Sequence, residues 1–241
     1  MKIKITLSYD GSKFRGSQIQ KEHDQTVASK LSYALSCLNI YSKINFSGRT
    51  DSGVHALAGV VDLELPSFWK DLDKLKSCLN RICLPEIYIK KIQKVDSNFH
   101  ARFSAKRRVY RYMISTNEVS VFLNSYITFV KSIDENKIQE AIKLFEGKHN
   151  FSLFKKSNSD TKSDICTIYK TRFYKYNDLY IMYFEADRFL RSQIRMMVGF
   201  LLKISESKLT TKDLIEQLSC KKLHNCTLAL PNGLYLAKIK Y

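Results

Sequence analysis

One short segment, residues 47–56, gathers the side-chain types that a reaction centre needs. Its sequence is Ser-Gly-Arg-Thr-Asp-Ser-Gly-Val-His-Ala, and its single carboxylate, Asp51, lies between two hydroxyl residues and two glycines. Glycines let a backbone approach a ligand closely, hydroxyl groups donate to a carboxylate, and the guanidinium of Arg49 suits phosphate. The segment therefore predicts one carboxylate acting beside an anionic ligand. The alternative is an ordinary Asx-type turn between two strands.

The neighbouring residues exclude some kinds of chemistry. We interpret His55 as a histidine at a turn or at the start of a strand rather than as a general base, because the sequence indicates no partner for it. A glycoside hydrolase needs two acids about 5 to 9 Å apart, and this segment holds one. The spacing of Cys220, His224 and Cys226 does not match a zinc knuckle. We therefore expect no metal ion at these three residues.

A second cluster, residues 99–112, interleaves cations with aromatic rings. If residues 106–112 form a strand, Arg108, Tyr110 and Tyr112 share one face, and Arg107 and Arg111 share the other. Such a surface suits the phosphates and exposed base faces of a nucleic acid. The alternative is a solvated strand edge that is protected by charge.

A third cluster, residues 188–199, has helical spacing. Arg188, Arg191 and Arg195 fall within one stripe at 100° per residue, and Leu190, Ile194 and Met197 fall within another. The pattern predicts a helix with one packed face and one face of guanidinium groups, used for recognition or ion pairing. A merely solvated helix face is the alternative.

The whole chain carries charge of the same sign as these clusters. Its 241 residues include 40 Lys plus Arg and 23 Asp plus Glu, a formal net charge of +17. The hydrophobic content of 44% is enough for a sizeable core, which excludes a disordered basic tail, and the charge predicts a polyanionic partner. Nucleic acid and anionic membrane both fit. Because there is no spanning segment, no signal-peptide core and no Cys-x-x-Cys pair, we expect a soluble protein in the reducing cytoplasm.

Periodicity supplies the elements that position these clusters. In the first half, alternation at residues 3–7 and helical spacing at residues 27–38 begin a β-α-β-β-α-β order, which is typical of a ferredoxin-like sheet. In the second half we expect strands near 106–116, 125–130, 165–175, 179–185 and 234–240, and helices after Asp134 and at 188–205 and 211–219. The predicted domains are residues 1–104, which carry the Asp51 segment, and 105–241, which carry Tyr110 and the arginine helix.

Together with residues 9–14 and 233–236, the three clusters resemble the TruA family of tRNA pseudouridine synthases over almost the full length. The segment Gly-Arg-Thr-Asp-x-Gly-Val-His, residues 48–55, is the most specific part. The resemblance implies the pseudouridine synthase fold, with two ferredoxin-like α+β domains whose antiparallel sheets join at a basic cleft. It also implies a homodimer without cofactor or metal that isomerises uridine to pseudouridine at positions 38 to 40 of the tRNA anticodon arm.

The resemblance also implies roles for individual residues. Asp51 would be the essential aspartate, acting as the catalytic nucleophile at C1′ or, alternatively, taking a C2′ proton to give a glycal. Arg195 would be its ion-pair partner, and Tyr110 the ring against the target base and a group for the C5 proton transfer. Arg49 would help to hold the base out of the stem. The further substrate-binding candidates are Arg107, Arg108, Arg111, Arg188 and Arg191. The chain departs from the family at Ser17, where an aromatic residue is usual, and at Ser192 and Gln193.

Two other classes of function compete with this interpretation. A catalytically silent tRNA-binding protein or RNA chaperone on the same fold would need the basic surface and would not need Asp51. A different RNA enzyme, such as a transglycosylase or a nuclease, is the third class. A nuclease usually needs a metal-binding cluster of carboxylates, and the sequence does not indicate one.

Overall fold

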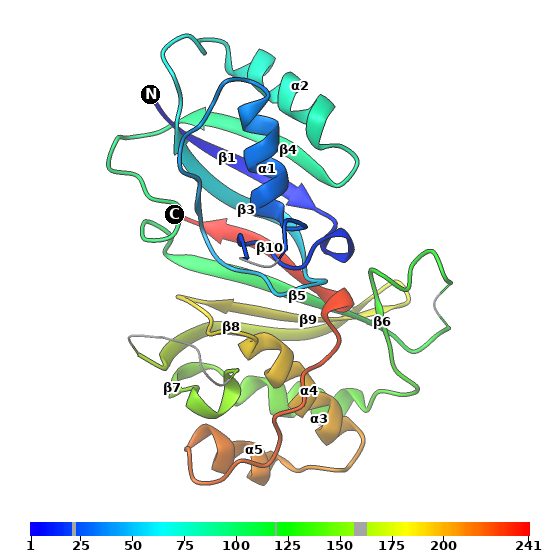
Figure 1. The fold of residues 1–241 in the computed structure, drawn as a ribbon. Coiled ribbons are helices and arrows are strands. Elements are labelled where there is room, and N and C mark those ends of the chain that lie inside the picture. Colours follow the sequence, from blue (N-terminus) through cyan, green and yellow to red (C-terminus); the bar gives the residue numbers. More distant parts are fainter. Residues whose placement is uncertain (21–22, 119, 157–162) are drawn as a thin grey trace. The chain divides into compact units, whose positions relative to one another are not determined.

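The computed structural model describes all residues except 21–22, 119 and 157–162 (Figure 1). The chain forms two compact units. Unit 1 comprises Met1–Lys106 and Tyr235–Tyr241, and unit 2 comprises Arg107–Leu234. Each unit combines helices with a mostly antiparallel sheet, so the α+β prediction is confirmed.

Unit 1 follows the predicted β-α-β-β-α-β order. Its elements are β1 (Lys2–Tyr9), α1 (Val27–Ser36), β2 (Asn45–Phe46), β3 (His55–Glu64), α2 (Leu72–Cys83), β4 (Ile87–Lys94) and β10 (Leu234–Lys240), with a short 3-10 helix η1 (Gly11–Lys13). The sheet order is β4-β1-β3-β10. β10 runs parallel to β3 at His55 and Ala56, while β2 pairs with β3 at Val61 and Asp62. β2 stays short because β10 takes the other part of the same edge.

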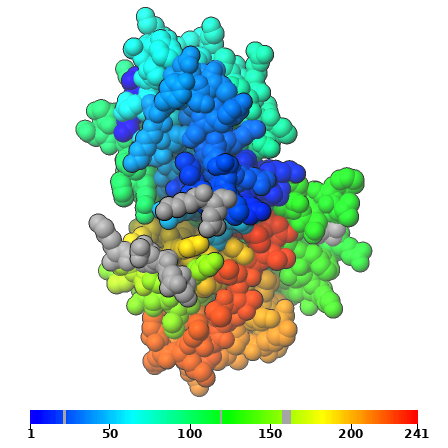
Figure 2. Space-filling view, viewed as in Figure 1, coloured from blue at the N-terminus to red at the C-terminus, as the bar shows by residue number. Residues whose placement is uncertain are grey.

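Alternation along β1 fixes the core of unit 1. Ile3, Ile5 and Leu7 alternate along β1 and are fully buried. Helices α1 and α2 lie over one face of the sheet of unit 1 (Figure 1). α1 begins after Thr26, whose Oγ1 accepts from the N–H of Ser29 at 3.1 Å. In Figure 2 the atoms of α1 (blue) form the surface of this face.

Unit 2 combines the remaining strands with three α-helices in its described part. Its strands follow the order β5-β9-β8-β7, and β6 pairs with β5. The elements are β5 (Arg107–Ser115), β6 (Thr128–Phe129), α3 (Glu135–Lys143), β7 (Gly147–Asn150), β8 (Ile165–Tyr176), β9 (Leu179–Ala186), α4 (Gln193–Ser205) and α5 (Thr211–Leu218), with 3-10 helices η2 (Ser152–Phe154) and η3 (Pro231–Gly233). Within the described residues, no helix has the length and apolar character needed to cross a membrane.

Two boundaries differ from the sequence-based expectation. The last strand, expected with residues 105–241, groups with unit 1 because it pairs with β3 and because the Tyr235 ring stacks on His55 at 4.7 Å. The helix expected over 188–205 begins only at Gln193, since Ser192 takes a left-handed φ of 60°. β7 was not expected from the sequence.

Candidate active site

The Asp51 loop connects β2 to β3 in unit 1. Ser47 fixes its beginning, because its N–H donates to Val60 O at 2.9 Å and its Oγ accepts from the N–H of Val60 at 3.3 Å. The loop turns at residues 51–54, where Val54 N–H donates to Asp51 O at 3.2 Å and Gly53 has a φ of 78°. Asp51 is half-buried, and Arg49 on the same loop is exposed.

Residues that follow β1 hold the two sides of Asp51. The N–H of Thr50 donates to Ser17 Oγ at 2.9 Å, and the N–H of Ser17 donates back to Thr50 O at 3.2 Å. The Thr50 hydroxyl also lies 2.7 Å from that of Tyr9. On the other side, Ser52 Oγ donates to Phe14 O at 3.3 Å. Asp51 is therefore positioned by its neighbours on both sides.

Ser17 is the positioning residue that the sequence analysis missed. It appeared there only as the loss of an aromatic residue that the family usually has. In the structure its side chain is 1% exposed and binds the backbone of the residue that precedes Asp51. The signal was present, since a small hydroxyl residue between Gly16 and Gln18 suits a buried contact with backbone, but the partner lies 33 positions away.

His55 supports the start of β3. Its ring is buried, stacks on Tyr235, and accepts from the N–H of Gly11 at Nδ1 over 3.0 Å. Asp10 Oδ1 lies 3.4 Å from the same nitrogen. Because Nδ1 accepts a backbone N–H, it has no proton for Asp10, whose Oδ1 accepts from Ser12 instead. This arrangement agrees with the interpretation of His55 as a structural histidine.

Tyr110 and Arg108 lie on the helix-facing side of β5 in unit 2. The Tyr110 ring is 8% exposed and meets Phe189 edge-on, with centroids 5.3 Å apart. An Arg108 guanidinium N–H donates to Asp187 O at 2.6 Å. Tyr112, two residues further along, is fully buried, and burial raises the pKa of its phenol to about 12. Tyr112 is therefore a core residue.

Arg107 and Arg111 lie on the opposite face of β5, as strand alternation requires. The Arg107 guanidinium donates to Glu185 Oε1 at 3.0 Å and lies 4.4 Å from the centre of the Tyr169 ring. Glu185 is only 3% exposed and also accepts from the Tyr183 hydroxyl at 2.6 Å. The Arg107 guanidinium thus balances the negative charge of the buried Glu185 carboxylate. Arg107 lies on the other face of β5 from Tyr110.

Arg195 lies in the first turn of α4 and is tied to the segment before η3. Its Nε donates to Ala229 O at 2.8 Å, and the N–H of Ala229 donates to Arg195 O at 3.0 Å. This close approach needs Gly199, because a Cβ there would lie 2.3 Å from Thr227 O. The Nε bond sets the direction of the Arg195 side chain, and the backbone bond holds the segment of Ala229 against α4.

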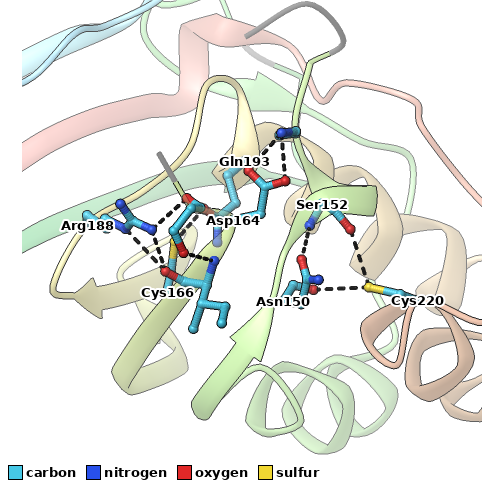
Figure 3. Close-up of polar contacts among 10 residues, drawn as sticks. Asn150, Ser152, Asp164, Cys166, Arg188, Gln193 and Cys220 are labelled. Carbon is cyan, nitrogen blue, oxygen red and sulfur yellow. Dashed lines mark hydrogen bonds and ion pairs between the residues drawn. The ribbon is translucent and has the colours of Figure 1, made fainter. Parts of the chain in front are cut away.

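The predicted stripe of three arginines is wrong in its geometry. Arg188 and Arg191 precede α4, so they do not lie on a common helix face with Arg195. The buried Gln193 side chain accepts from Leu190 N–H at 2.7 Å, which fixes the turn before the helix. The same side chain contacts Cys166 (Figure 3). The Arg188 guanidinium donates to the carbonyls of Ser163 and Ile165, whereas Arg191 is exposed.

One group of residues in the described part has donor atoms close enough to hold a metal ion: Asp213, Glu216 and His224. The two nitrogens of His224 face different carboxylates, Asp213 at 3.4 Å and Glu216 at 2.8 Å. A metal ion would bind only one of the two ring nitrogens of His224, whereas the two carboxylates lie at different nitrogens. The arrangement therefore suits an imidazole that bridges Asp213 and Glu216. Cys220 contacts Asn150 and Ser152 instead (Figure 3).

Comparison with known proteins gives the family. The model of the tRNA pseudouridine synthase family matches residues 5–104 and 141–241. The chain is 44% identical over 241 residues to tRNA pseudouridine synthase A of Campylobacter jejuni (strain RM1221), with both chains covered in full. It is 43% identical to the Wolinella succinogenes protein of the same name, covering 98% of this chain and 92% of that one. For the Helicobacter hepaticus protein the identity is 37%, covering 99% and 98%. The chain therefore belongs to the tRNA pseudouridine synthase family.

Proposed function

We propose that this enzyme converts uridine to pseudouridine at positions 38, 39 and 40 of the tRNA anticodon arm, and that Asp51 is its nucleophile. The class of reaction follows from the family: the chain is an isomerase that acts on uridine in tRNA. The observation that carries the proposal for Asp51 is its fixed position. Hydrogen bonds made by its neighbours, from Thr50 to Ser17 and from Ser52 to Phe14, hold the loop on both sides of Asp51, the single carboxylate of residues 47–56.

In the proposed reaction, the bond from C1′ of the ribose changes from N1 to C5 of the uracil. C5 loses one proton and N1 gains one. A carboxylate oxygen of Asp51 bonds to C1′ as the C1′–N1 bond breaks, and the electron pair stays on the uracil. After the base rotates, C5 bonds to C1′ and the carboxylate leaves. The C5 proton is then removed and N1 gains a proton, so the product is an isomer of the substrate. No oxidant or reductant is needed.

Tyr110 and Arg195 have distinct proposed roles in this sequence of steps. An arginine favours the charged form of a carboxylate, as Arg195 would for Asp51. The Tyr110 ring offers a flat face for the base, and its hydroxyl can move the C5 proton. The edge-on contact with Phe189 and the hydrogen bond to Ala229 support these roles, because both side chains already have defined directions.

The remaining arginines are proposed to bind tRNA in two ways. Arg49 and Arg191 are exposed and can contact phosphates directly. Arg107, Arg108 and Arg188 have protein partners, and with Arg111 they add to the positive potential that attracts the tRNA. Because phosphate contacts release counterions, tRNA affinity should fall steeply as salt rises.

An Asp51→Asn variant tests the proposal. Wild-type and variant protein are incubated with an unmodified tRNA transcript, and pseudouridine is mapped along the RNA. We expect pseudouridine at positions 38 to 40 with the wild type and none with the variant, whose tRNA affinity should stay within about tenfold. Asp73→Asn, which changes an exposed carboxylate on α2, is the matched control and should retain activity.

The outcomes separate the parts of the proposal. Full activity of Asp51→Asn would exclude Asp51 as the nucleophile. Pseudouridine at other positions would overturn the proposed target, and tRNA binding by wild-type protein without product would favour a silent RNA-binding protein.

We further propose that the protein acts as a homodimer in the cytoplasm. The resemblance to the family supports the dimer, and the six free cysteines are compatible with a reducing compartment. Light scattering of the purified protein measures the oligomeric state, and a monomeric mass would exclude the dimer.

A further inference from the structure

Residues 99–104 form an exposed turn between β4 and β5 that presents one aromatic ring to solvent. Phe103 is 75% exposed. Single exposed apolar side chains are common on protein surfaces, so this ring is distinguished by its neighbours rather than by its exposure alone. The turn belongs to unit 1 and contains none of the residues proposed above for the reaction.

Two nitrogen-bearing side chains of the same turn flank this ring. The Arg102 guanidinium carbon lies 5.6 Å from the centre of the Phe103 ring, and the His100 ring lies 4.4 Å from it at an angle of 45°. Arg102 is itself exposed. Because the guanidinium lies over the ring, the ring surface that remains exposed offers a π face next to a positive charge, which suits a base and its phosphate.

The turn is fixed in place before any ligand binds. The N–H of Ala101 donates to Asp62 Oδ1 at 2.6 Å, and the carbonyl of Ala101 accepts from the Tyr241 hydroxyl at 3.0 Å. Ser104 closes the turn, because its N–H donates to His100 O at 2.9 Å and its Oγ accepts from His100 N–H at 3.0 Å. A fixed turn loses little conformational entropy when a ligand stacks on it.

The surroundings of the turn favour an anion. Residues 94–106 carry Lys94, Arg102 and Lys106 against the single acid Asp96. Lys4 on β1 adds a further cation, since its Nζ lies 5.3 Å from the centre of the Tyr241 ring. The residues on either side of Phe103 are Arg102 and Ser104, so the turn lacks the contiguous apolar neighbours that an interface with another protein would use.

We propose that Phe103 is a stacking platform for an unpaired base of the bound tRNA, with Arg102 beside it for the phosphate. This inference rests on the proposed function in one respect, since it takes tRNA as the ligand. The platform contributes to affinity through the π face of the ring. Phe103 is a binding residue and has no part in the bond changes at the uridine.

Three substitutions at Phe103 test the stacking. The full-length protein is titrated into fluorescently labelled, unmodified tRNA, and the dissociation constant is measured at several salt concentrations. Phe103→Ala should bind about tenfold more weakly. Phe103→Leu should bind equally weakly, because it keeps an apolar side chain without a π face, whereas Phe103→Trp should bind as tightly as the wild type. The salt dependence should stay unchanged, since stacking releases no counterions.

Phe68→Ala is the matched control, because Phe68 is a second exposed phenylalanine of unit 1, with 62% exposure. It should bind like the wild type. Wild-type affinity of Phe103→Ala, or of Phe103→Leu, would overturn the stacking. A Phe103→Ala variant with intact tRNA affinity and a changed oligomeric mass would also overturn the proposal, because the ring would then belong to an interface between protein chains. Pseudouridine formation by the wild type is measured in parallel, so loss of the proposed function is distinguishable from loss of the platform.

Discussion

The Oγ of Ser17 accepts a hydrogen bond of 2.9 Å from the backbone N–H of Thr50, the residue before Asp51. The Ser17 backbone adds a second hydrogen bond to the same residue, and the Thr50 hydroxyl bonds to Tyr9. These contacts fix the backbone from which the carboxylate projects. Small displacements of a reacting group cost catalysis more than they cost binding. We therefore expect the buried Ser17 to position the proposed nucleophile, Asp51.

Replacing Ser17 with alanine should lower the turnover number about tenfold and leave the KM for tRNA within twofold, because the Thr50 N–H loses its acceptor while the RNA surface is unchanged. Steady-state pseudouridine formation measures both constants. Ser17→Thr keeps the hydroxyl and should recover part of the rate. Ser67→Ala removes an exposed serine of the same unit as a control. An unchanged turnover number in Ser17→Ala would exclude the positioning role.

The hydrogen bond between Ser17 and Thr50 is an example of a contact that could not be predicted from the sequence. Local patterns were sufficient for β1, α1 and the loop around Asp51, because alternation, an N-cap and glycine act over a few residues. The bond from Ser17 to Thr50 spans 33 positions, and the ion pair of Arg107 with Glu185 spans 78. No spacing rule predicts such partners, so the position of Ser17 beside Thr50 was missed and Glu185 was not named as the partner of Arg107.

Helical periodicity was misleading at residues 188–192. The arginine spacing predicted a helix there, but the Gln193 side chain satisfies the N–H of Leu190 and the chain turns at Ser192 instead. A buried side chain that replaces a backbone acceptor can move a helix start by several residues. The strand alternation of β5 was predicted correctly, whereas the sequence could not say which of its two faces is covered by helices.

Tyr110 is proposed to act through both its ring and its hydroxyl, and two variants separate the two. Tyr110→Phe keeps the ring and its contact with Phe189, so we expect tRNA affinity to be retained and turnover to fall at least a hundredfold, the usual size of a general acid–base contribution. Tyr110→Ala should in addition weaken tRNA binding. The measurement is single-turnover pseudouridine formation at saturating enzyme.

The control for Tyr110 is Tyr176→Phe, because Tyr176 is a 65% exposed tyrosine of the same unit. Its rate should match the wild type. If Tyr110→Phe also reacts at the wild-type rate, the hydroxyl does not transfer the proton and the ring alone is used.

Arg195 combines a proposed ion pair with a structural hydrogen bond to Ala229. Arg195→Lys keeps the positive charge but cannot make the same fork of donors, so we expect a loss of rate of at least tenfold with the fold intact. Single-turnover kinetics together with circular dichroism check both statements. Arg81→Lys, at an exposed position on α2, serves as the matched control, because it makes the same exchange of arginine for lysine away from the proposed site. A folded Arg195→Lys protein with the wild-type rate would contradict the role.

Asp62 anchors the turn that carries Phe103, although it lies inside the sheet. Its side chain is fully buried and accepts from Ala101 N–H at 2.6 Å and from Asn45 Nδ2 at 3.0 Å, with Lys2 Nζ at 3.5 Å. Asp62→Ala leaves these donors without an acceptor, so we expect urea unfolding to show a loss of about 3 kcal/mol. Asp62→Asn keeps one acceptor oxygen and should lose less. Glu64→Ala removes a 61% exposed carboxylate 4.0 Å from the same lysine and should cost less than about 1 kcal/mol. If Asp62→Ala and Glu64→Ala lower the free energy of unfolding equally, the buried hydrogen bonds of Asp62 contribute no more than an exposed ion pair. Asp62 would then not be the residue that anchors the turn.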